Sequence, residues 1–450
     1  MGLSLRQQAI RLYEIINGRH ILERMAELDR IQWLSREELL DFQNKKLHRV
    51  LSYAYEFVPY YGRLFDQVGF QPDDILTDPA SFQKIPFLTK ALIRENLDDL
   101  LTTEASRRSG MSQLSTAGST GEPLVFMRDL DFRDYTMAEI HHHLSWSGWQ
   151  FGQPHAYIFG ASFEVSYARN LRAQLMNWAL NRFLTNAYVL SEESMHAFAA
   201  KAMRRRPRLL SGYVSSVYRF AQFLRDKSAY DLRFVDAVYG TSEVLYPHQR
   251  KFIEDTFECE VFSRYATREL GALACECPAH TGLHISFGNV YIEILKDGVP
   301  TEPGEAGDIF VTNLNNLGMP FIRYQLADSV AWYPEDNCPC GRAHPMIKVQ
   351  GGRSNDLFRT QDGRAVWGGI GNPLWNMEGV KKFQFIQKTY DHVVVLIVKE
   401  GPMSQAQRAE VERAVKTALG DQVKVDFEFP DEIPVGPSGK HRYQICEIAD

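Results

Sequence analysis

The chain has 450 residues, of which 44% are hydrophobic and 24% are charged, and its formal net charge at pH 7 is -6. A single hydrophobic core generally stops growing at about 250–300 residues, so we expect at least two domains. The mild negative charge excludes the strongly basic surface typical of nucleic-acid-binding proteins, and the composition excludes extensive disorder. The one basic segment, Lys201–Arg208, is interpreted as a solvated helix end.

The amino-terminal segment indicates a cytoplasmic protein. Its first 20 residues lack the apolar core of a secretory signal, and Arg6 stands where the myristoylation pattern requires Ser or Thr. No window reaches the roughly 18 consecutive apolar residues of a membrane span, so we expect no integral membrane segment.

The order of predicted elements indicates an α/β protein. Residues 1–105 are predicted to be mainly helical, because apolar residues recur at three- and four-residue spacing over residues 36–65. Short β-rich runs then alternate with helical patterns, which is typical of a parallel sheet. The strands are expected at residues 154–160, 208–213 and 235–240, and the helices at residues 216–226 and 247–257.

A change of pattern follows near Leu283, where strands and turns replace the alternation. After residues 351–358 a smaller α+β unit is predicted, with a helix that begins at an N-cap, Ser404. We therefore expect a large domain over residues 1–354, with mostly parallel sheets and helices, and a small mobile domain over residues 355–450. The strands of the small domain are predicted at residues 381–389, 392–401 and 422–429.

The segment "STAGSTGEPL", Ser115–Leu124, combines two glycines with four hydroxyl-bearing residues. Free backbone N–H groups and hydroxyls in such a loop can wrap phosphate oxygens. A flexible surface turn explains the same composition, and the segment fits neither the P-loop pattern nor the Gly-x-Gly-x-x-Gly pattern. The remaining motifs must decide between these interpretations.

Five motifs in order resemble those of the adenylate-forming ligases, a superfamily that includes acyl-CoA synthetases and peptide-synthetase adenylation domains. They are "STAGSTGEP", "SRYATRELG", "IRYQLAD", "GGRSNDL" and "PVGPSGKHR". Within the superfamily, "CPCGRAHPMIKVQGGRSND" and "YATRELGALACECPAHTGLHI" are similar to the phenylacetate-CoA ligase branch and its capsular polysaccharide CapK group. The resemblance covers roughly Leu34 to Tyr443.

The resemblance implies an ATP site in the large domain. The phosphate loop would hold the ATP phosphates through Ser115, Gly118, Ser119, Thr120 and Gly121. Glu122 stands where relatives often have Lys, and we expect it to face solvent.

Other nucleotide contacts are implied in the same way. Tyr265 would lie beside the adenine, near the segment that starts at Gly240, and Asp328 and Arg353 would approach the ribose. A carboxylate such as Asp328 offers two acceptor oxygens to the ribose hydroxyls. Taken singly, Asp328, Glu269 and Arg353 are better explained as surface or salt-bridged residues, and it is the order of the motifs that favours the nucleotide site.

Catalytic roles follow from the resemblance for four residues. Glu269 would help to hold Mg²⁺, which neutralises the leaving pyrophosphate, and either Thr267 or Arg268 would contact the α-phosphate. Lys440 resembles the lysine that reaches the reacting carboxylate and α-phosphate, where an ammonium stabilises two approaching anions.

The hinge between the two domains is implied at Asn355 and Asp356. Asn355 stands where Asp is usual, and Ala266 and Ala327 replace glycines that relatives carry. These departures leave the identity of the pivot open.

Cysteine pairs suggest a second site. Cys275, Cys277, Cys338 and Cys340 could bind Zn²⁺ tetrahedrally, with His280 or His284 as alternative ligands, or they could be buried thiols. Cys259 and Cys446 have no evident partners. The run His141–His143 is not expected to bind one metal ion, because consecutive helical residues point in different directions, although one of these rings could line the acid pocket.

The sequence therefore predicts an AMP-forming acid–thiol ligase that uses ATP, Mg²⁺ and a small carboxylic acid, and that transfers the acyl group to coenzyme A. An amide-forming ligase in polysaccharide modification, with an amine acceptor, stays open, as does a non-catalytic nucleotide-binding relative. No nucleic-acid partner is expected, and the oligomeric state, a dimer included, is left open.

Overall fold

The computed structural model describes residues 5–116, 124–159, 171–187, 190–227, 233–335, 337–353, 358–361, 365–366, 370, 372–375, 377, 379–433 and 443–448. The chain divides into two compact units. The larger contains residues 1–326 and 331–348, and the smaller contains residues 327–330 and 349–450. The predicted domain boundary at residues 354 and 355 lies outside the described residues. No helix among the described residues is long and apolar enough to cross a membrane.

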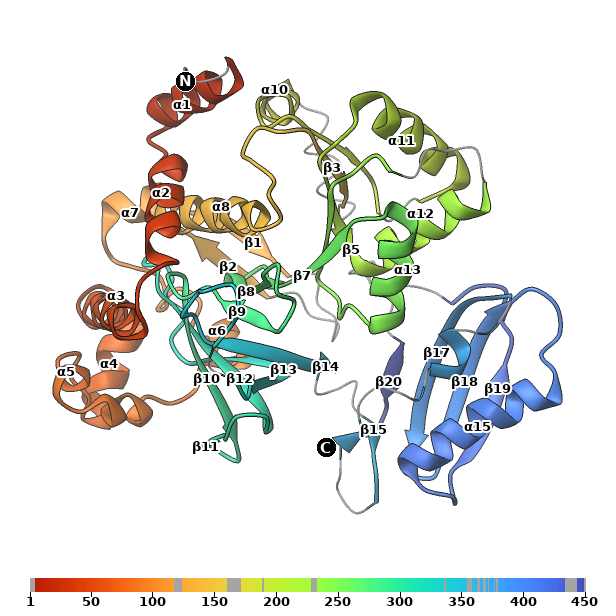
Figure 1. Ribbon diagram of the computed structural model, residues 1–450. Helices are drawn as coiled ribbons and strands as arrows, with labels where there is room; N and C mark the ends of the chain where they lie inside the picture. The colour runs from red at the N-terminus through yellow and green to blue at the C-terminus, as the bar shows by residue number, and fades with distance from the viewer. Residues whose placement is uncertain are drawn as a thin grey trace. The chain divides into compact units, whose positions relative to one another are not determined.

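Residues 5–105 are mainly helical, as Figure 1 shows in red and orange. Ser35 caps the longest helix, because its side chain accepts a hydrogen bond from Glu38 N while the Glu38 carboxylate accepts one from Ser35 N. Pro59 follows the end of that helix and begins the next one. The elements are α1 (Leu5–Asn17), α2 (Ile21–Ile31), α3 (Arg36–Phe57), α4 (Pro59–Val68), α5 (Asp74–Thr77), the 3-10 helix η1 (Pro79–Lys84), α6 (Lys90–Glu95) and α7 (Ala105–Ser109).

A 12-stranded sheet forms the centre of the large unit, in the order β11-β10-β12-β13-β14-β9-β8-β7-β6-β5-β3-β4. Its parallel strands are β4 (Arg182–Thr185), β3 (His155–Ile158), β5 (Leu209–Tyr213), β6 (Ala237–Thr241) and β7 (Glu260–Thr267). Antiparallel pairing starts at β8 (Gly271–Glu276) and continues through β9 (Leu283–Ile285) to β14 (Met346–Arg353). The other strands are β10 (Val290–Lys296), β11 (Val299–Pro300), β12 (Ala306–Asn313) and β13 (Tyr324–Trp332).

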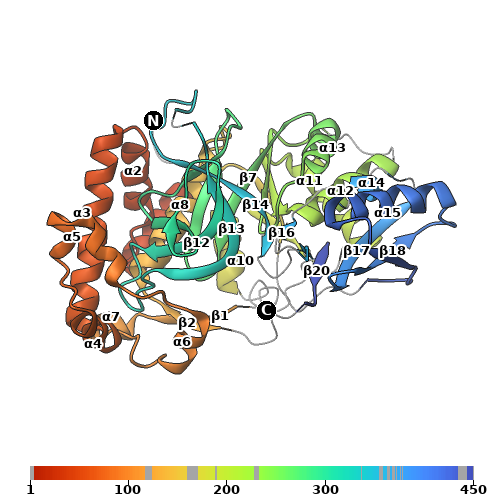
Figure 2. The same cartoon turned by 90° about the horizontal axis from the view of Figure 1, so that it is seen from below.

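Helices bury both faces of the parallel strands (Figures 1 and 2). One face packs on α11 (Glu192–Arg205), α12 (Val214–Asp226) and α13 (Pro247–Phe257), with Phe198, Phe220 and Phe257 in the core. The other face contacts α8 (Leu130–Ser145) through Leu144 and the tryptophan that follows the helix, Trp146. The described residues of this unit also form α10 (Leu171–Ala179). Because both faces of these strands are buried, their sequences are continuous apolar runs.

The small unit contains an α+β fold. Its sheet has the order β19-β18-β17-β20, from β17 (Val380–Thr389), β18 (His392–Lys399), β19 (Lys424–Glu428) and β20 (Gln444–Cys446). Helix α15 (Gln405–Leu419) packs Val411 and Val415 into the core of this unit, and the predicted cap Ser404 is confirmed by a reciprocal capping box with Gln407. The short elements are β15 (Phe358–Arg359), β16 (Ala365–Val366) and α14 (Asn372–Trp375). The predicted fold class, a large α/β domain followed by a small α+β domain, is confirmed.

Candidate active site and metal centre

The predicted phosphate loop is carried by a two-stranded hairpin of β1 (Ser112–Ser115) and β2 (Val125–Arg128). Two hydrogen bonds between Thr116 and Leu124 join the two ends of the loop. Thr116 N donates to Leu124 O at 2.9 Å, and Leu124 N donates to Thr116 Oγ1 at 3.0 Å. Ser115 is exposed at the end of β1. The other predicted phosphate ligands, Gly118, Ser119, Thr120 and Gly121, lie outside the described residues, as does Glu122.

Three predicted catalytic residues lie where β7 turns into β8. The Thr267 hydroxyl accepts a hydrogen bond from Leu270 N at 3.1 Å, which fixes the turn, and Glu269 is buried with 7% exposure. Gly271 has φ +75°, and a Cβ there would lie 2.9 Å from Thr136 Oγ1 on α8. Only glycine allows this conformation and this close approach without strain.

Arg268 joins this turn to the hairpin, because its Nη1 donates to the carbonyl oxygen of Ser115 at 3.1 Å. Two segments more than 150 residues apart in sequence therefore meet beside the predicted phosphate loop. The structure brings the predicted residues Ser115 and Arg268 together.

Sequence reasoning missed a group of arginines at the same place. Arg128 ends β2, and its Nε is buried without a hydrogen-bond partner among the described residues. Burial, with the nearby charges of Arg133, Arg268 and Arg19, lowers the pKa of Arg128 to about 10. It stays protonated at neutral pH, and of its neighbours Arg19 is paired with the Asp134 carboxylate. The only signal in the sequence was an arginine that ends a strand following a glycine-rich loop.

The other predicted nucleotide ligands are spread over the sheet. Gly240 is on β6, where a Cβ would lie 2.9 Å from Val214 Cγ2, so it allows α12 to pack closely. Tyr265 is on β7 opposite Ala274, and Asp328 is on β13 in the part assigned to the small unit. The side chain of Arg353, and all of Asn355, Asp356 and Lys440, lie outside the described residues.

Four side chains converge into a cluster with the geometry of a metal site: Cys277, His284, Cys338 and Cys340. Their ligand atoms all lie within 4.8 Å of one another. Cys277 Sγ is 3.5 Å from Cys338 Sγ, and Cys340 Sγ is 3.4 Å from His284 Nε2. The cluster therefore contains three of the four predicted cysteines, together with one of the two histidines predicted as alternative ligands.

A backbone contact orients the histidine. His284 Nδ1 lies 3.1 Å from the carbonyl oxygen of His344, which accepts a hydrogen bond when Nδ1 carries the proton and leaves Nε2 to face the cysteines. Burial lowers the pKa of His284 to about 4, so the imidazole is neutral, as a metal ligand must be. Burial also raises the pKa of Cys277 to about 12.

Cys275 is not in the cluster, which corrects the prediction of a four-cysteine site. It lies in the middle of the sheet, and its Sγ is 3.6 Å from the Glu276 carbonyl and hydrogen-bonded with Tyr239. His280 is excluded too, because its ring contacts the Glu276 carboxylate and Arg250.

The histidine run His141–His143 diverges, as expected for consecutive helical residues. His141 stacks on Trp149, His142 Nδ1 contacts the Asp29 carboxylate at 3.0 Å, and His143 Nε2 contacts Glu139 at 3.2 Å. The three rings do not share a ligand position.

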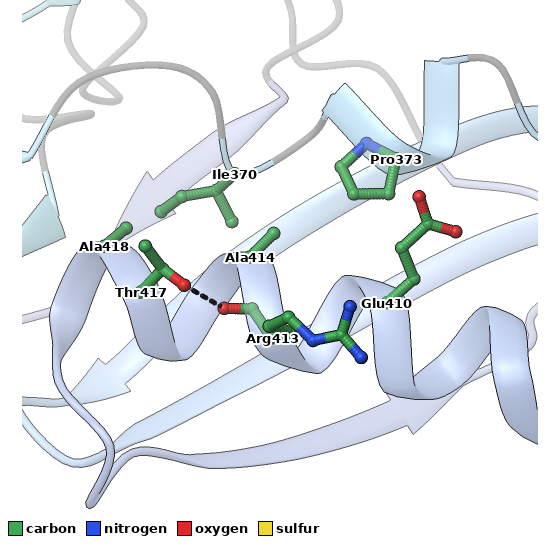
Figure 3. A pocket seen from close by; sticks show the side chains of 7 residues that line it. All are labelled: Ile370, Pro373, Glu410, Arg413, Ala414, Thr417 and Ala418. Carbon is green, nitrogen blue, oxygen red and sulfur yellow. Dashed lines mark hydrogen bonds between the residues drawn. The ribbon is translucent and has the colours of Figure 1, made fainter.

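A separate cavity of about 430 Å³ lies on the small unit, between α14 and α15 (Figure 3). None of the predicted site residues lines it. Its lining residues are Ile370, Pro373, Glu410, Arg413, Ala414, Thr417 and Ala418.

Comparison with known proteins agrees with the motifs. Residues 358–447 match the family described as the CapK C-terminal domain. The chain is 24% identical to protein CapK of Staphylococcus aureus over 91% of this chain and 90% of that protein. It is 24% identical to a phenylacetate-coenzyme A ligase of Thermus thermophilus, over 88% of this chain and 86% of that protein. Over most of its length the chain is therefore similar to CapK and to the phenylacetate-CoA ligases.

The likeness to known ligases extends to the fold of the chain. A crystal structure of 2-hydroxyisobutyryl-CoA ligase, in the postadenylation state with an acyl-adenylate, has a TM-score of 0.75 to the chain. The identity is 19%, and the match covers 92% of this chain and 91% of that one. The resemblance predicted from the motifs is confirmed.

Proposed function

We propose that this protein activates a carboxylic acid with ATP to form an acyl-adenylate and pyrophosphate, and then transfers the acyl group to coenzyme A. The observation that carries the proposal is the contact between Arg268 and Ser115, which joins the predicted phosphate loop to the turn that holds Glu269. The similarity to phenylacetate-CoA ligases supports the thiol of coenzyme A as acceptor.

In the first step, the residues around the hairpin would bind the ATP phosphates. Arg268 and Arg128 offset the negative charge that gathers on the α-phosphate and the leaving pyrophosphate. Glu269 offers the carboxylate oxygens that Mg²⁺ prefers, and it is held by the short β7–β8 turn. Bound Mg²⁺ would neutralise phosphate charge there.

The rest of the nucleotide site is proposed from the resemblance alone. Tyr265 would contact the adenine, Asp328 and Arg353 the ribose, and Lys440 the reacting carboxylate. Movement about Asn355 and Asp356 would bring Lys440 to the site for adenylation and take it away before the thiol attacks.

A polysaccharide-related amine acceptor is the second candidate, favoured by the similarity to CapK. The substrates ATP and coenzyme A, with reduced cysteines at the metal cluster, support a cytoplasmic location.

The acceptor is tested by AMP release from a panel of aryl, short-chain and uronic acids, each with and without coenzyme A. We expect coenzyme A to accelerate AMP release for at least one acid. Hydroxamate trapping of the adenylate, together with acceleration by an amine but not by coenzyme A, would assign the protein to amide formation instead. A chain that releases no AMP with any acid would be a non-catalytic relative.

We also propose that Cys277, His284, Cys338 and Cys340 bind a structural Zn²⁺. Three soft thiolates and one imidazole are a common tetrahedral zinc set. The sulfurs and Nε2 already lie within 4.8 Å of one another, and the backbone carbonyl of His344 supports the ligand histidine. Zinc would tie the end of β8 and the start of β9 to the loop before β14.

Metal analysis of the purified protein tests this site. We expect about one Zn²⁺ per chain, with metal content and melting temperature both lowered in Cys338→Ser and unchanged in the matched control Cys259→Ser. Cys259 lies apart, packed against the core formed with α11–α13. Metal-free protein, or equal melting of the two variants, would contradict a zinc site.

A further inference from the structure

A layer of side chains lies at the carboxyl ends of the parallel strands, on the face that packs against α8. In the register of the sheet, Tyr213 of β5 lies beside Thr241 of β6, and Thr241 lies beside Arg264 of β7. Phe159, which directly follows β3, contacts the Tyr213 ring at 4.5 Å between ring centres. Ligands of open α/β sheets bind outside the carboxyl ends of the strands, so this layer faces the expected binding crevice.

Beneath this layer, the polar side chains on the same face of the sheet form hydrogen bonds with other protein groups. His155 Nε2 and the Ser211 hydroxyl share a hydrogen bond of 2.8 Å, and the Tyr239 hydroxyl donates to His143 O at 2.5 Å. Tyr157 is hydrogen-bonded to Arg182, which also lies over its ring. These polar groups have partners, so they form the floor of the site and need no ligand.

Arg264 and His141 differ from this floor. Arg264 is half-buried, its Nε is fully buried, and the described residues give its guanidinium no hydrogen-bond or ion-pair partner. His141 is 4% exposed, and within the described part of the chain neither of its ring nitrogens has a hydrogen-bond partner. Trp149 stacks on one side of this imidazole, and Phe151 meets it edge-on at 4.6 Å. Buried polar groups normally have partners, so these two exceptions, which interact electrostatically, need an explanation.

No ion pair joins Arg264 or His141 to a carboxylate among the described residues, although Glu139 and Glu276 act on the same neighbours, His143 and Cys275. Besides burial, the groups that lower the pKa of His141, to about 3, are Arg182 and Arg264, and no carboxylate acts on it. Arg182 and Arg264 are likewise the two charges that act on Tyr157. The imidazole is therefore neutral and can donate one hydrogen bond, while Arg264 supplies a positive charge that has no direct ion-pair partner among the described residues.

Arg264 also has the right place in the chain. It directly precedes Tyr265, the proposed adenine contact, and successive side chains of a strand point to opposite faces. An acid joined to a nucleotide at the end of β7 would therefore extend along the α8 face, where Arg264 and His141 lie.

We propose that Arg264, assisted by His141, binds a second anionic group of the substrate, so that the acid activated by this protein is a dicarboxylate or a similar dianion. This inference rests on the proposed function. The reacting carboxylate stays with the ATP site, and the second anion replaces the partners that Arg264 lacks. Arg264 is then a specificity residue, because it contacts a part of the substrate that does not react.

The test compares each diacid with its own half-ester, which removes only the second charge. Glutarate is paired with its monomethyl ester, and 4-carboxyphenylacetate with its 4-methyl ester. Acid-dependent exchange of labelled pyrophosphate into ATP gives kcat/KM for each. We expect the wild type to prefer the diacids, and Arg264→Gln to lower the diacid-to-ester ratio roughly 10- to 100-fold, the usual effect of losing a charged hydrogen bond.

Two further variants separate recognition from a general loss of structure. Arg264→Lys keeps the charge and should retain most of the preference. Arg233→Gln removes an exposed arginine that pairs with Glu258 and should leave the ratio unchanged. Equal loss of diacid and half-ester in Arg264→Gln would mean that Arg264 binds the reacting carboxylate or only supports the fold, and would overturn the inference.

Calorimetry with glutarate and a non-hydrolysable ATP analogue distinguishes this inference from the proposed function. If no acid supports exchange but glutarate binds the wild type and not Arg264→Gln, the second-anion site stands and the ligase proposal fails. If exchange occurs and monoacids are preferred over every diacid, the ligase proposal stands and the second-anion site fails.

Discussion

Two arginines of the large unit, Arg323 and Arg264, show opposite solutions to the burial of a guanidinium. Arg323 is 4% exposed and makes a bidentate contact with Glu293, at 3.0 Å from Nε and 2.9 Å from Nη2. Its Nη1 donates to the carbonyl oxygens of Gln83 and Ile85, and the Phe87 ring lies 4.5 Å away. Arg264 has no such partner among the described residues.

The difference indicates that Arg323 has a structural role and that Arg264 has a role in binding. A buried arginine that uses its donors on the protein joins elements, here the segment before β13 to β10 and η1. A buried arginine that leaves them unused is stable only because part of it reaches water, and it can bind an incoming anion without losing internal contacts. The position of unused donors is therefore a guide to the substrate.

The largest expected effect on stability is that of Arg323→Met. Burial already raises the pKa of Glu293 even with Arg323 beside it, so removal of the guanidinium leaves a buried carboxylate without its partner. Loss of one partner of a buried ion pair costs about 3–5 kcal/mol. Urea denaturation followed by circular dichroism should show this loss in the transition of the large unit. A loss under about 1 kcal/mol would contradict the structural role of Arg323.

A much smaller effect is expected for Arg264→Met, in the same assay without substrate. Since no described residue pairs with the Arg264 guanidinium, the free energy of unfolding should change by less than about 1 kcal/mol in either direction. A loss as large as that of Arg323→Met would mean that Arg264 is held by the protein itself, and the comparison would fail.

Much of the fold was predictable because the local patterns agree with the tertiary structure. The strands β3 and β5 lie within the apolar runs identified in the sequence, β6 overlaps its run and ends one residue beyond it, and Ser404 caps α15 as expected. The break between α3 and α4 was less visible, because the apolar spacing continues through Val58 and only Pro59 marks it.

The metal cluster shows the limit of sequence reasoning. Spacing favoured Cys275 and Cys277 equally, but a ligand set is decided by which way each side chain points. Cys275 lies opposite His284 in the sheet, yet its sulfur contacts Tyr239 while the imidazole faces Cys340. The lack of a described partner for Arg264 and the group of arginines around Arg128 could not be predicted from the sequence either, because both depend on neighbours from distant parts of the chain.

The central claim, adenylation of a carboxylic acid, is tested most directly by acid-dependent exchange of labelled pyrophosphate into ATP, for the wild type and for Lys440→Ala. The account predicts exchange by the wild type and a roughly hundredfold or greater loss in Lys440→Ala, the usual effect of removing one charged donor from a transition state. Conversion of a supplied acyl-adenylate with coenzyme A should fall far less. Undiminished exchange in Lys440→Ala would contradict the role of the lysine, and no exchange by the wild type with any acid would contradict the ligase function itself.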